Sequence, residues 1–403
     1  MAKTWDYSLL VVQDEPHYAD ESTFCSEANY GYFVNWVGAH AARTTLAVPT
    51  ARGCTPFGQP LDLPNVAFKE MPYWRSLSTY VRLGRREKRA LRALARELVS
   101  QHDAVMVRLP SLAAALFARQ ARLQNRTLVT YLGGNILTAA NPLRASNALI
   151  RVTARILARY VDRVMMRIVG EADLCFAVGH ELFGLCKGRA RRAVQLMTSL
   201  IPEACLLERE DSHHGEGGWV LFRAARINPN KGTQFLLEAL ALLLRRGYDV
   251  RLKLAGGTND PVHVAGLRAW CDEHGIADRV DWLGHVAFGE DLFEHYRGSH
   301  IGVLSSLSEG FPRFVGEAWA FSLPVVATDL PALRPPAVPD DNALLVAPGS
   351  GQALADAIAR VIEDTALRRR IIRAGAAVAR QNTAEGQSKR VADLIGEAVS
   401  LGR

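Results

Sequence analysis

Hydrophobic residues along this chain gather in short runs that alternate with longer segments of helical period. Short apolar runs bounded by turn residues are typical of strands that are buried on both faces of a parallel sheet. In the first half the predicted strands are Ser8–Gln13, Thr45–Val48, Ala104–Arg108, Thr127–Leu132 and Leu174–Val178. The helices predicted between them include Tyr32–Ala42, Arg89–Ser100 and Ser111–Leu123.

The second half repeats this alternation. Its predicted strands are Trp219–Ala224, Arg251–Gly256, Arg279–Leu283, Ile301–Ser305, Pro324–Ala327 and Leu344–Val346, and its predicted helices include Thr233–Arg246, Val262–His274 and Phe314–Phe321. Repeated β-α units specify a parallel sheet with helices on both faces. We therefore expect an α/β protein with two Rossmann-like, doubly wound domains facing a central cleft, in which ligands bind beyond the carboxyl ends of the strands.

The boundary between the two halves is visible as a change of composition. Residues 208–218 are rich in glycine and charge and contain no large apolar residue, which is typical of a linker. After Pro348 the pattern becomes entirely helical. The predicted organisation is an N-terminal domain over 1–207, a linker over 208–218, a C-terminal domain over 219–381 and a final helix over 382–403.

Composition places the chain among soluble globular proteins. Of its 403 residues, 49% are hydrophobic and 22% are charged. No stretch approaches the roughly 18–20 apolar residues of a membrane span, and the N-terminus lacks the features of a secretory signal. The 6 cysteines are scattered without metal-ligand spacing, so we expect reduced thiols and a cytoplasmic protein.

The chain carries a formal net charge of +7, which suits an anionic partner. One predicted helix carries Arg151, Arg155, Arg159, Arg163 and Arg167 beside an apolar series of the same spacing, Val152, Ile156, Tyr160, Val164 and Ile168; a second basic helix spans residues 82–96. Two interpretations stay open: a solvated helix face, or an amphipathic surface that places the protein at the inner face of the plasma membrane. A nucleic-acid partner is not expected, because no aromatic-interleaved basic patch accompanies the arginines.

The segment from Ser305 to Asp329 concentrates the candidate chemistry. It is predicted to form a strand, a tight loop, a helix and another strand, with Glu309 and Gly310 in the loop and Pro312 before the helix. Glu317 follows in the first turns of that helix. Two carboxylates thus flank a helix N-terminus, whose N–H groups attract phosphate oxygens while carboxylates accept sugar hydroxyls. A nucleotide sugar offers both kinds of group.

Two cations follow the first strand of the same domain. Arg226 and Lys231 flank a turn, and Lys231-Gly232 opens the next helix. Paired cations stabilise a leaving diphosphate when no metal neutralises it. The sequence contains no Asp-x-Asp pair for holding a divalent ion, so we expect neither a metal nor another cofactor.

Taken together, these motifs resemble retaining GT-B glycosyltransferases of family 4, which carry an E-x7-E motif. The resemblance covers roughly residues 219–381 and includes Leu254-Ala-Gly-Gly257, Trp282-Leu-Gly-His285 and the two glutamates eight positions apart. It implies that Arg226 and Lys231 bind the donor diphosphate, that Glu317 binds the ribose and that Glu309 contacts the transferred sugar. It also implies that the final helix braces the N-terminal domain.

On this basis we predict the residues of the nucleotide-sugar site. Arg226, Lys231 and Glu309 are the expected catalytic residues, and the donor-binding residues are Arg226, Lys231, Gly257, Gly284, His285, Glu309, Gly310, Phe311, Pro312, Arg313 and Glu317. The acceptor is a sugar, a lipid-linked or a small-molecule hydroxyl, as in bacterial glycan, glycolipid or glycosylated-metabolite biosynthesis.

The N-terminal half departs from the family pattern. Only Gly31 stands where many relatives carry a Gly-Gly loop, and Gly133, Gly134 and Asn135 occupy a region where many place a histidine. These four residues are the acceptor-side candidates. Two alternatives remain: another GT-B enzyme, such as a nucleotide-sugar epimerase or a phosphorylase, and a non-catalytic protein that binds nucleotide sugars.

Overall fold

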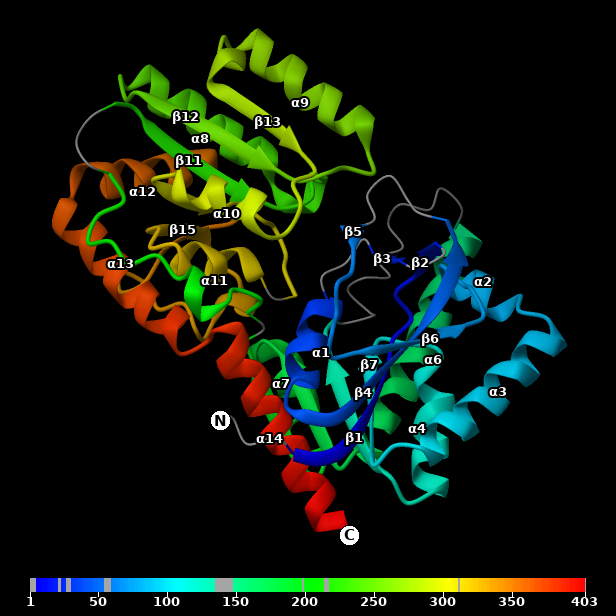
Figure 1. Cartoon of the computed structure of the whole chain (residues 1–403). Coiled ribbons are helices and arrows are strands. Elements are labelled where there is room, and N and C mark those ends of the chain that lie inside the picture. The colour runs from blue at the N-terminus through cyan, green and yellow to red at the C-terminus, as the bar shows by residue number, and fades with distance from the viewer. Residues whose placement is uncertain are drawn as a thin grey trace. The chain divides into compact units, whose positions relative to one another are not determined.

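The chain folds into two compact units that are seen in a computed structural model (Figure 1). The structure describes residues 5–20, 23–26, 30–53, 59–134, 148–197, 199–213, 217–310 and 312–402. Unit 1 comprises Met1–Met197 and Glu385–Arg403, and unit 2 comprises Thr198–Ala384. Both units are built on the expected pattern, a largely parallel sheet with helices packed on it.

The sheet of unit 1 has the strand order β10-β9-β8-β7-β1-β4-β2-β3-β5, with β6 paired to β4. Strands β4, β6, β7, β8, β9 and β10 continue the parallel sheet on either side of β1, whereas β3 pairs antiparallel with β2 and β5. The strands are β1 (Trp5–Val12), β2 (His17–Asp20), β3 (Thr23–Ser26), β4 (Ala41–Arg52), β5 (Gln59–Pro60), β6 (Ala67–Met71), β7 (Ala104–Leu109), β8 (Thr127–Leu132), β9 (Leu174–Val178) and β10 (Ala193–Leu196).

The helices of unit 1 cover its sheet and include the C-terminal helix of the chain. They are α1 (Tyr30–Gly38), α2 (Leu77–Val81), α3 (Arg85–Ser100), α4 (Ala114–Leu123), α6 (Ala148–Glu171), α7 (His180–Cys186) and α14 (Ala384–Gly402). Helix α14 is joined to β1 by hydrogen bonds from Trp5 Nε1 to Asp393 at 2.9 Å and from Tyr7 Oη to the Ala392 carbonyl at 3.1 Å. Within the described ranges, no helix is long and apolar enough to cross a membrane.

The sheet of unit 2 is entirely parallel, with the order β13-β12-β11-β14-β15-β16. Its strands are β11 (Trp219–Ala224), β12 (Val250–Ala255), β13 (Val280–Gly284), β14 (Ile301–Leu304), β15 (Val325–Thr328) and β16 (Leu344–Val346). The helices are α8 (Thr233–Arg245), α9 (Pro261–Glu273), α10 (Glu290–Arg297), α11 (Arg313–Ala320), α12 (Gly351–Glu363) and α13 (Thr365–Arg380). Helices α8 and α12 pack side by side, and α11 packs on β14 and β15.

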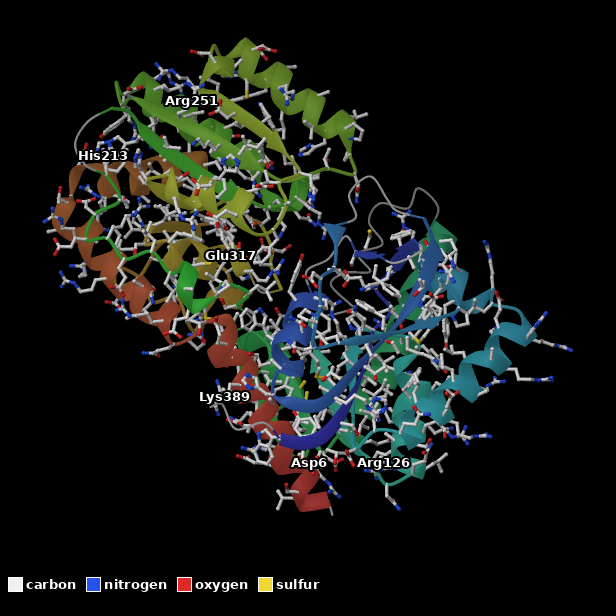
Figure 2. The ribbon with its side chains drawn as sticks, in the orientation of Figure 1. Asp6, Arg126, His213, Arg251, Glu317 and Lys389 are labelled. Carbon is white, nitrogen blue, oxygen red and sulfur yellow. The ribbon has the colours of Figure 1, made fainter. Side chains whose placement is uncertain are left out.

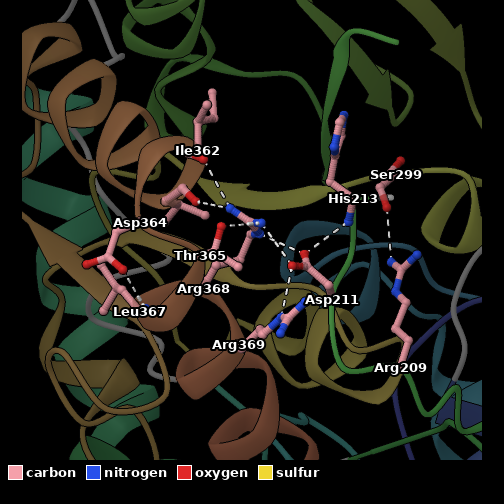
Figure 3. A network of polar contacts seen from close by, with 11 residues as sticks. Arg209, Asp211, His213, Ser299, Ile362, Asp364, Thr365, Leu367, Arg368 and Arg369 are labelled. Carbon is pink, nitrogen blue, oxygen red and sulfur yellow. Dashed lines mark hydrogen bonds and ion pairs between the residues drawn. The ribbon is translucent and has the colours of Figure 1, made fainter. Parts of the chain in front are cut away.

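The predicted linker over 208–218 is wrong for its first half. Asp211 and Ser212 are buried, and the backbone N–H of Leu207 donates to the Ala320 carbonyl at 2.9 Å. Asp211 accepts hydrogen bonds from Arg368 of α13 at 2.7 and 2.9 Å (Figure 3). Composition alone suggested an exposed tether here, but this aspartate compensates a buried arginine. The boundary between the units therefore falls at Met197, ten residues before the predicted end of the N-terminal domain.

Candidate functional site

The strand order of unit 2 marks the place where a ligand is expected. Numbered along the unit, the order β13-β12-β11-β14-β15-β16 becomes 3-2-1-4-5-6, the order of the Rossmann fold. Chain direction across the sheet reverses between β11 and β14, and ligands of such sheets bind beyond the carboxyl ends of the strands at this switch point. The segments that follow β11 and β14 are residues 225–232 and 305–312.

These two segments contact each other through a glycine. Gly232 has a φ of +60°, and a Cβ at this position would lie 2.1 Å from the Ser305 carbonyl oxygen. The Leu307 N–H also donates to the Asn230 carbonyl at 2.8 Å. Only a residue without a side chain permits this approach, so Lys231 is held directly beside the loop that follows β14.

Lys231 and Glu309 form an ion pair at the switch point. Lys231 Nζ lies 2.6 Å from both carboxylate oxygens of Glu309, and Ser306 Oγ donates to Oε1 at 2.6 Å. The Glu309 side chain is only 8% exposed, whereas 22% of the Lys231 side chain remains exposed. One cation and one hydroxyl thus compensate the burial of this carboxylate.

A buried arginine beneath this pair fixes the Lys231 backbone. Arg223, the penultimate residue of β11, is 1% exposed; its Nη1 donates to Thr233 Oγ1 at 2.7 Å and its Nη2 donates to the Lys231 carbonyl. Burial lowers the pKa of Arg223 to about 10, against the attraction of Glu309. Sequence reasoning did not single out this residue, although a lone charged residue in an apolar strand is the signal that marks it.

Glu317 lies in the second turn of α11, inside unit 2 (Figure 2). It is 8% exposed, and Tyr296 of α10 donates from Oη to its Oε2 at 2.7 Å. Burial, reinforced by the negative charge of Glu317, raises the pKa of Tyr296 well above its ordinary value, so the tyrosine is a hydrogen-bond donor at neutral pH. Tyr296 fixes one carboxylate oxygen, and the sequence pattern gave no sign of it.

The other predicted donor residues lie around the same edge of the sheet. Arg226 is exposed in the turn after β11, and Arg313 is exposed at the start of α11, directly after the buried Pro312. Gly310 is exposed, and a Cβ there would have no atom within 4 Å. Phe311 lies outside the described residues.

Residues after β12 and β13 complete this edge. The Ile227 N–H donates to the Gly257 carbonyl at 2.9 Å, and the Gly256 N–H donates to the Gly284 carbonyl at 2.6 Å. His285 follows Gly284 and is exposed. The described residues of the predicted donor site therefore lie in the loops after four adjacent strands or on α11, although they are spread over 92 positions from 226 to 317.

The acceptor-side candidates of unit 1 are not equivalent. Gly31 is the second residue of α1 and is buried, and a Cβ there would lie 3.2 Å from Leu63 Cδ1, so this glycine serves helix packing. Gly133 and Gly134 directly follow the carboxyl end of β8. Asn135 lies outside the described residues.

Comparison with known proteins assigns a family to the part of the chain that carries the switch-point residues. Residues 207–378 match the family described as "Glycosyl transferases group 1". This part of the chain is a group 1 glycosyltransferase domain. It contains Lys231, Glu309 and Glu317 together with the strands that position them.

Curated relatives resemble less than half of the chain. The D-inositol 3-phosphate glycosyltransferase of Salinispora tropica is 29% identical over 194 residues, which are 46% of this chain and 39% of that protein. The phosphatidyl-myo-inositol mannosyltransferase of Mycobacterium leprae is 31% identical over 170 residues, 41% of this chain and 42% of that protein. The chain thus spans about two fifths of the length of these curated relatives.

Solved structures resemble the whole chain. Anabaena HepE in complex with UDP covers 97% of this chain and 100% of its own, with a TM-score of 0.74 and 18% identity. Sucrose-phosphate synthase from Thermosynechococcus elongatus covers 98% of this chain and 100% of its own, with a TM-score of 0.72 and 16% identity. Identity this low shows the fold alone, which confirms the predicted GT-B fold of two Rossmann-like units.

Proposed function

We propose that the protein is a retaining glycosyltransferase that moves a sugar from a nucleoside-diphosphate sugar to an acceptor hydroxyl. The Lys231–Glu309 ion pair at the switch point of a group 1 glycosyltransferase domain carries this proposal. The pair stands at the place where open α/β sheets bind ligands. In this pair, a cation that can bind a diphosphate lies beside a carboxylate that can accept a hydrogen bond from a sugar hydroxyl. These are the two kinds of group that a nucleotide sugar presents.

Each residue then has a role in the transfer. Arg226 and Lys231 stabilise the diphosphate as it leaves, Glu309 orients the sugar, and Glu317, fixed by Tyr296, accepts the ribose hydroxyls. The bond from the anomeric carbon to the diphosphate oxygen breaks, and the diphosphate departs with the electron pair. The acceptor oxygen bonds to the same face of the anomeric carbon, and its proton passes to the departing phosphate oxygen.

The transfer needs no metal ion in this proposal, because two cationic side chains supply the charge that the leaving diphosphate requires. It needs no other cofactor either. The acceptor is a hydroxyl of a sugar, of a lipid-linked glycan or of a small molecule. The names of the curated relatives, which specify inositol phosphate and phosphatidyl-inositol, support a polyhydroxylated acceptor.

Release of free nucleotide from UDP-, GDP- and ADP-sugars tests this function directly. The expected result is release from at least one donor that continues unchanged when EDTA is present. Chelator-sensitive release would contradict the metal-free mechanism. Tight donor binding without any release, on every acceptor offered, would instead favour a nucleotide-sugar-binding protein, and formation of an epimeric nucleotide sugar would favour an epimerase.

A second proposal concerns membrane attachment by helix α6. Val152, Ile156, Leu157 and Tyr160 are large apolar side chains of this helix that are 41–64% exposed. The exposed arginines Arg159, Arg163 and Arg167 continue along it, while Val161, Met165 and Ile168 face the core. We propose that this exposed face docks on an anionic bilayer, because apolar burial and attraction to lipid phosphate then act together.

Flotation with phosphatidylserine-containing vesicles tests this attachment. We expect wild type to float, and both Ile156→Ser/Tyr160→Ser and Arg159→Glu/Arg163→Glu to float several-fold less. Arg245→Glu/Arg373→Glu is the charge-matched control, since both of these arginines are exposed on unit 2. Equal flotation of wild type and the α6 variants would end the proposal.

A further inference from the structure

The sheet of unit 1 has a switch point of its own. From β1, the strand order continues through β4 to β6 on one side of the sheet and through β7, β8 and β9 to β10 on the other. The order in which the chain adds strands therefore reverses between β1 and β7. Glu15 follows the carboxyl end of β1, and Arg108 is the penultimate residue of β7. Their side chains form an ion pair, with Arg108 Nη1 2.6 Å from Glu15 Oε2. Each sheet thus carries one cation and one glutamate where its strand order reverses.

The Arg108 guanidinium is held from several sides but keeps one edge open. Its Nη1 also donates to Gln13 Oε1 at 3.0 Å, and its Cζ lies 4.4 Å from the centre of the Tyr30 ring. All of its hydrogen bonds to described residues leave from Nη1, and 30% of the side chain is exposed. The Nε–H and Nη2–H groups therefore remain as a planar pair of donors, the geometry with which arginine binds two oxygens at once.

Glu15 also retains an acceptor. Its Oε2 takes the bond from Arg108, and its Oε1 has no hydrogen bond from any residue that the structure describes. The Glu15 side chain is 27% exposed. Gly133, at the end of the neighbouring β8, leaves the space beside Arg108 open, since a Cβ there would lie 3.8 Å from Arg108 Nε.

Three buried polar atoms around this pair lack a partner within the described part of the chain. They are Gln13 Nε2, His17 Nε2 and Tyr30 Oη, on residues that are 1%, 1% and 7% exposed. Leaving a buried donor or acceptor unpaired costs about 1–3 kcal/mol, and folded proteins rarely tolerate several together. These three atoms make the surroundings of Arg108 and Glu15 polar.

We propose that Arg108 and Glu15 form the acceptor-binding site and take two neighbouring hydroxyls of an uncharged polyol, a sugar or a cyclitol. The inference rests on the proposed transferase function. Arg108 donates hydrogen bonds to the hydroxyl oxygens, and Glu15 Oε1 accepts a hydrogen bond from a hydroxyl. Because Glu15 already balances the charge of Arg108, the pair suits a group that both donates and accepts better than it suits a phosphate.

Binding measured by saturation-transfer NMR tests this site separately from the donor site. Glucose, mannose and myo-inositol are the neutral probes, glucose 6-phosphate is the charged one, and UDP is titrated into the same samples. We expect at least one neutral probe to bind wild type, and to bind Arg108→Gln and Glu15→Gln at least about tenfold more weakly. UDP affinity and the thermal unfolding transition stay unchanged in both variants.

A matched control is Arg191→Gln, which opens an exposed ion pair with Asp173 on the same unit and should leave polyol binding unchanged. Polyol binding that survives both Arg108→Gln and Glu15→Gln, binding confined to glucose 6-phosphate, or UDP binding with no polyol bound would each overturn the assignment. Failure of the proposed function looks different, because UDP itself then does not bind or its sugars are not turned over.

Discussion

At the scale of single residues, unit 2 keeps two ion pairs away from water, and they serve different ends. Lys231 and Glu309 leave part of the lysine exposed at the carboxyl edge of the sheet. Arg368 and Asp211 are 6% and 9% exposed, and the arginine also donates to the carbonyls of Val361 and Ile362 (Figure 3). The first pair lies at the proposed donor site, whereas the second fastens the segment after unit 1 to α13.

The second pair makes the stability of unit 2 depend on pH in acid. Burial alone raises the pKa of Asp211, but hydrogen bonds from Arg368, the His213 N–H and Arg369 outweigh it and lower the pKa from 3.8 to about 2. A lowered pKa in the folded state contributes stability that is complete above pH 4 and is lost as the pH falls through 2.

We therefore expect Asp211→Asn to destabilise unit 2 by about 3–5 kcal/mol at pH 7, because it leaves the buried Arg368 guanidinium without its counter-charge. The deficit should shrink between pH 4 and pH 2, where wild type loses the same contribution. Urea unfolding of both proteins across this range measures it. A constant difference at all pH values would contradict the pairing. Asp340→Asn, in an exposed pair with Arg360 on the same unit, should change stability little.

The residues of the site were predictable from sequence only where a motif marks them, as the two glutamates eight positions apart mark Glu309 and Glu317. Lys231 and Glu309 stand in loops after strands, next to glycines, and the structure places them in contact. Three residues were not predicted, because periodicity within a regular element indicates packing rather than a site. Arg223 and Arg108 lie inside strands, and Tyr296 lies on a helix. Their partners come from distant segments, and no spacing along the chain encodes such a contact.

At the scale of elements, the site depends on two glycines with different physical reasons. Gly232 is enclosed, with a positive φ and the Ser305 carbonyl where a Cβ would stand. Gly310 is open, because no atom lies within 4 Å of a Cβ there. The first glycine permits the loops to meet, and the second leaves the space beside Glu309 empty.

These surroundings predict that alanine lowers stability at Gly232 and activity at Gly310. Gly232→Ala should lower the free energy of unfolding by at least about 2 kcal/mol. An alanine is strained at this positive φ, and its methyl group would collide with the Ser305 carbonyl. Gly310→Ala should change that free energy by less than about 0.5 kcal/mol but reduce nucleotide release about tenfold or more. Equal stability of both variants, measured by chemical denaturation, would contradict the packing at Gly232.

Eleven strands of the parallel sheets were predicted, because each is an apolar run, whereas the parallel strands β6 and β10 were not. Four predicted strands, among them Thr127–Leu132 and Trp219–Ala224, match the observed bounds. Strands β2, β3 and β5 were not predicted, since they are only two to four residues long and pair partly antiparallel at one side of the sheet. Helix α1 ends at Gly38 rather than Ala42, because Ala41 already begins β4.

At the scale of the whole molecule, the two units repeat one plan. The first strand of each unit lies where the strand order reverses, between β4 and β7 in unit 1 and between β12 and β14 in unit 2. A glutamate and a cation face each other at each of these points. The alternation of apolar runs predicted two such units. It did not predict their boundary, because the glycine-rich composition after Leu207 hides the buried Asp211.

The central claim is that the switch point of unit 2 holds the nucleotide sugar through Lys231 and Glu309. Rates of nucleotide release from the preferred donor by wild type, Lys231→Gln and Glu309→Gln test it most directly. Lys187→Gln and Glu181→Gln, at exposed positions of unit 1, are the matched controls. We predict a loss of about 100-fold or more in each switch-point variant, with thermal unfolding preserved and the controls at wild-type rates. Release at the wild-type rate by folded Lys231→Gln and Glu309→Gln would contradict the claim.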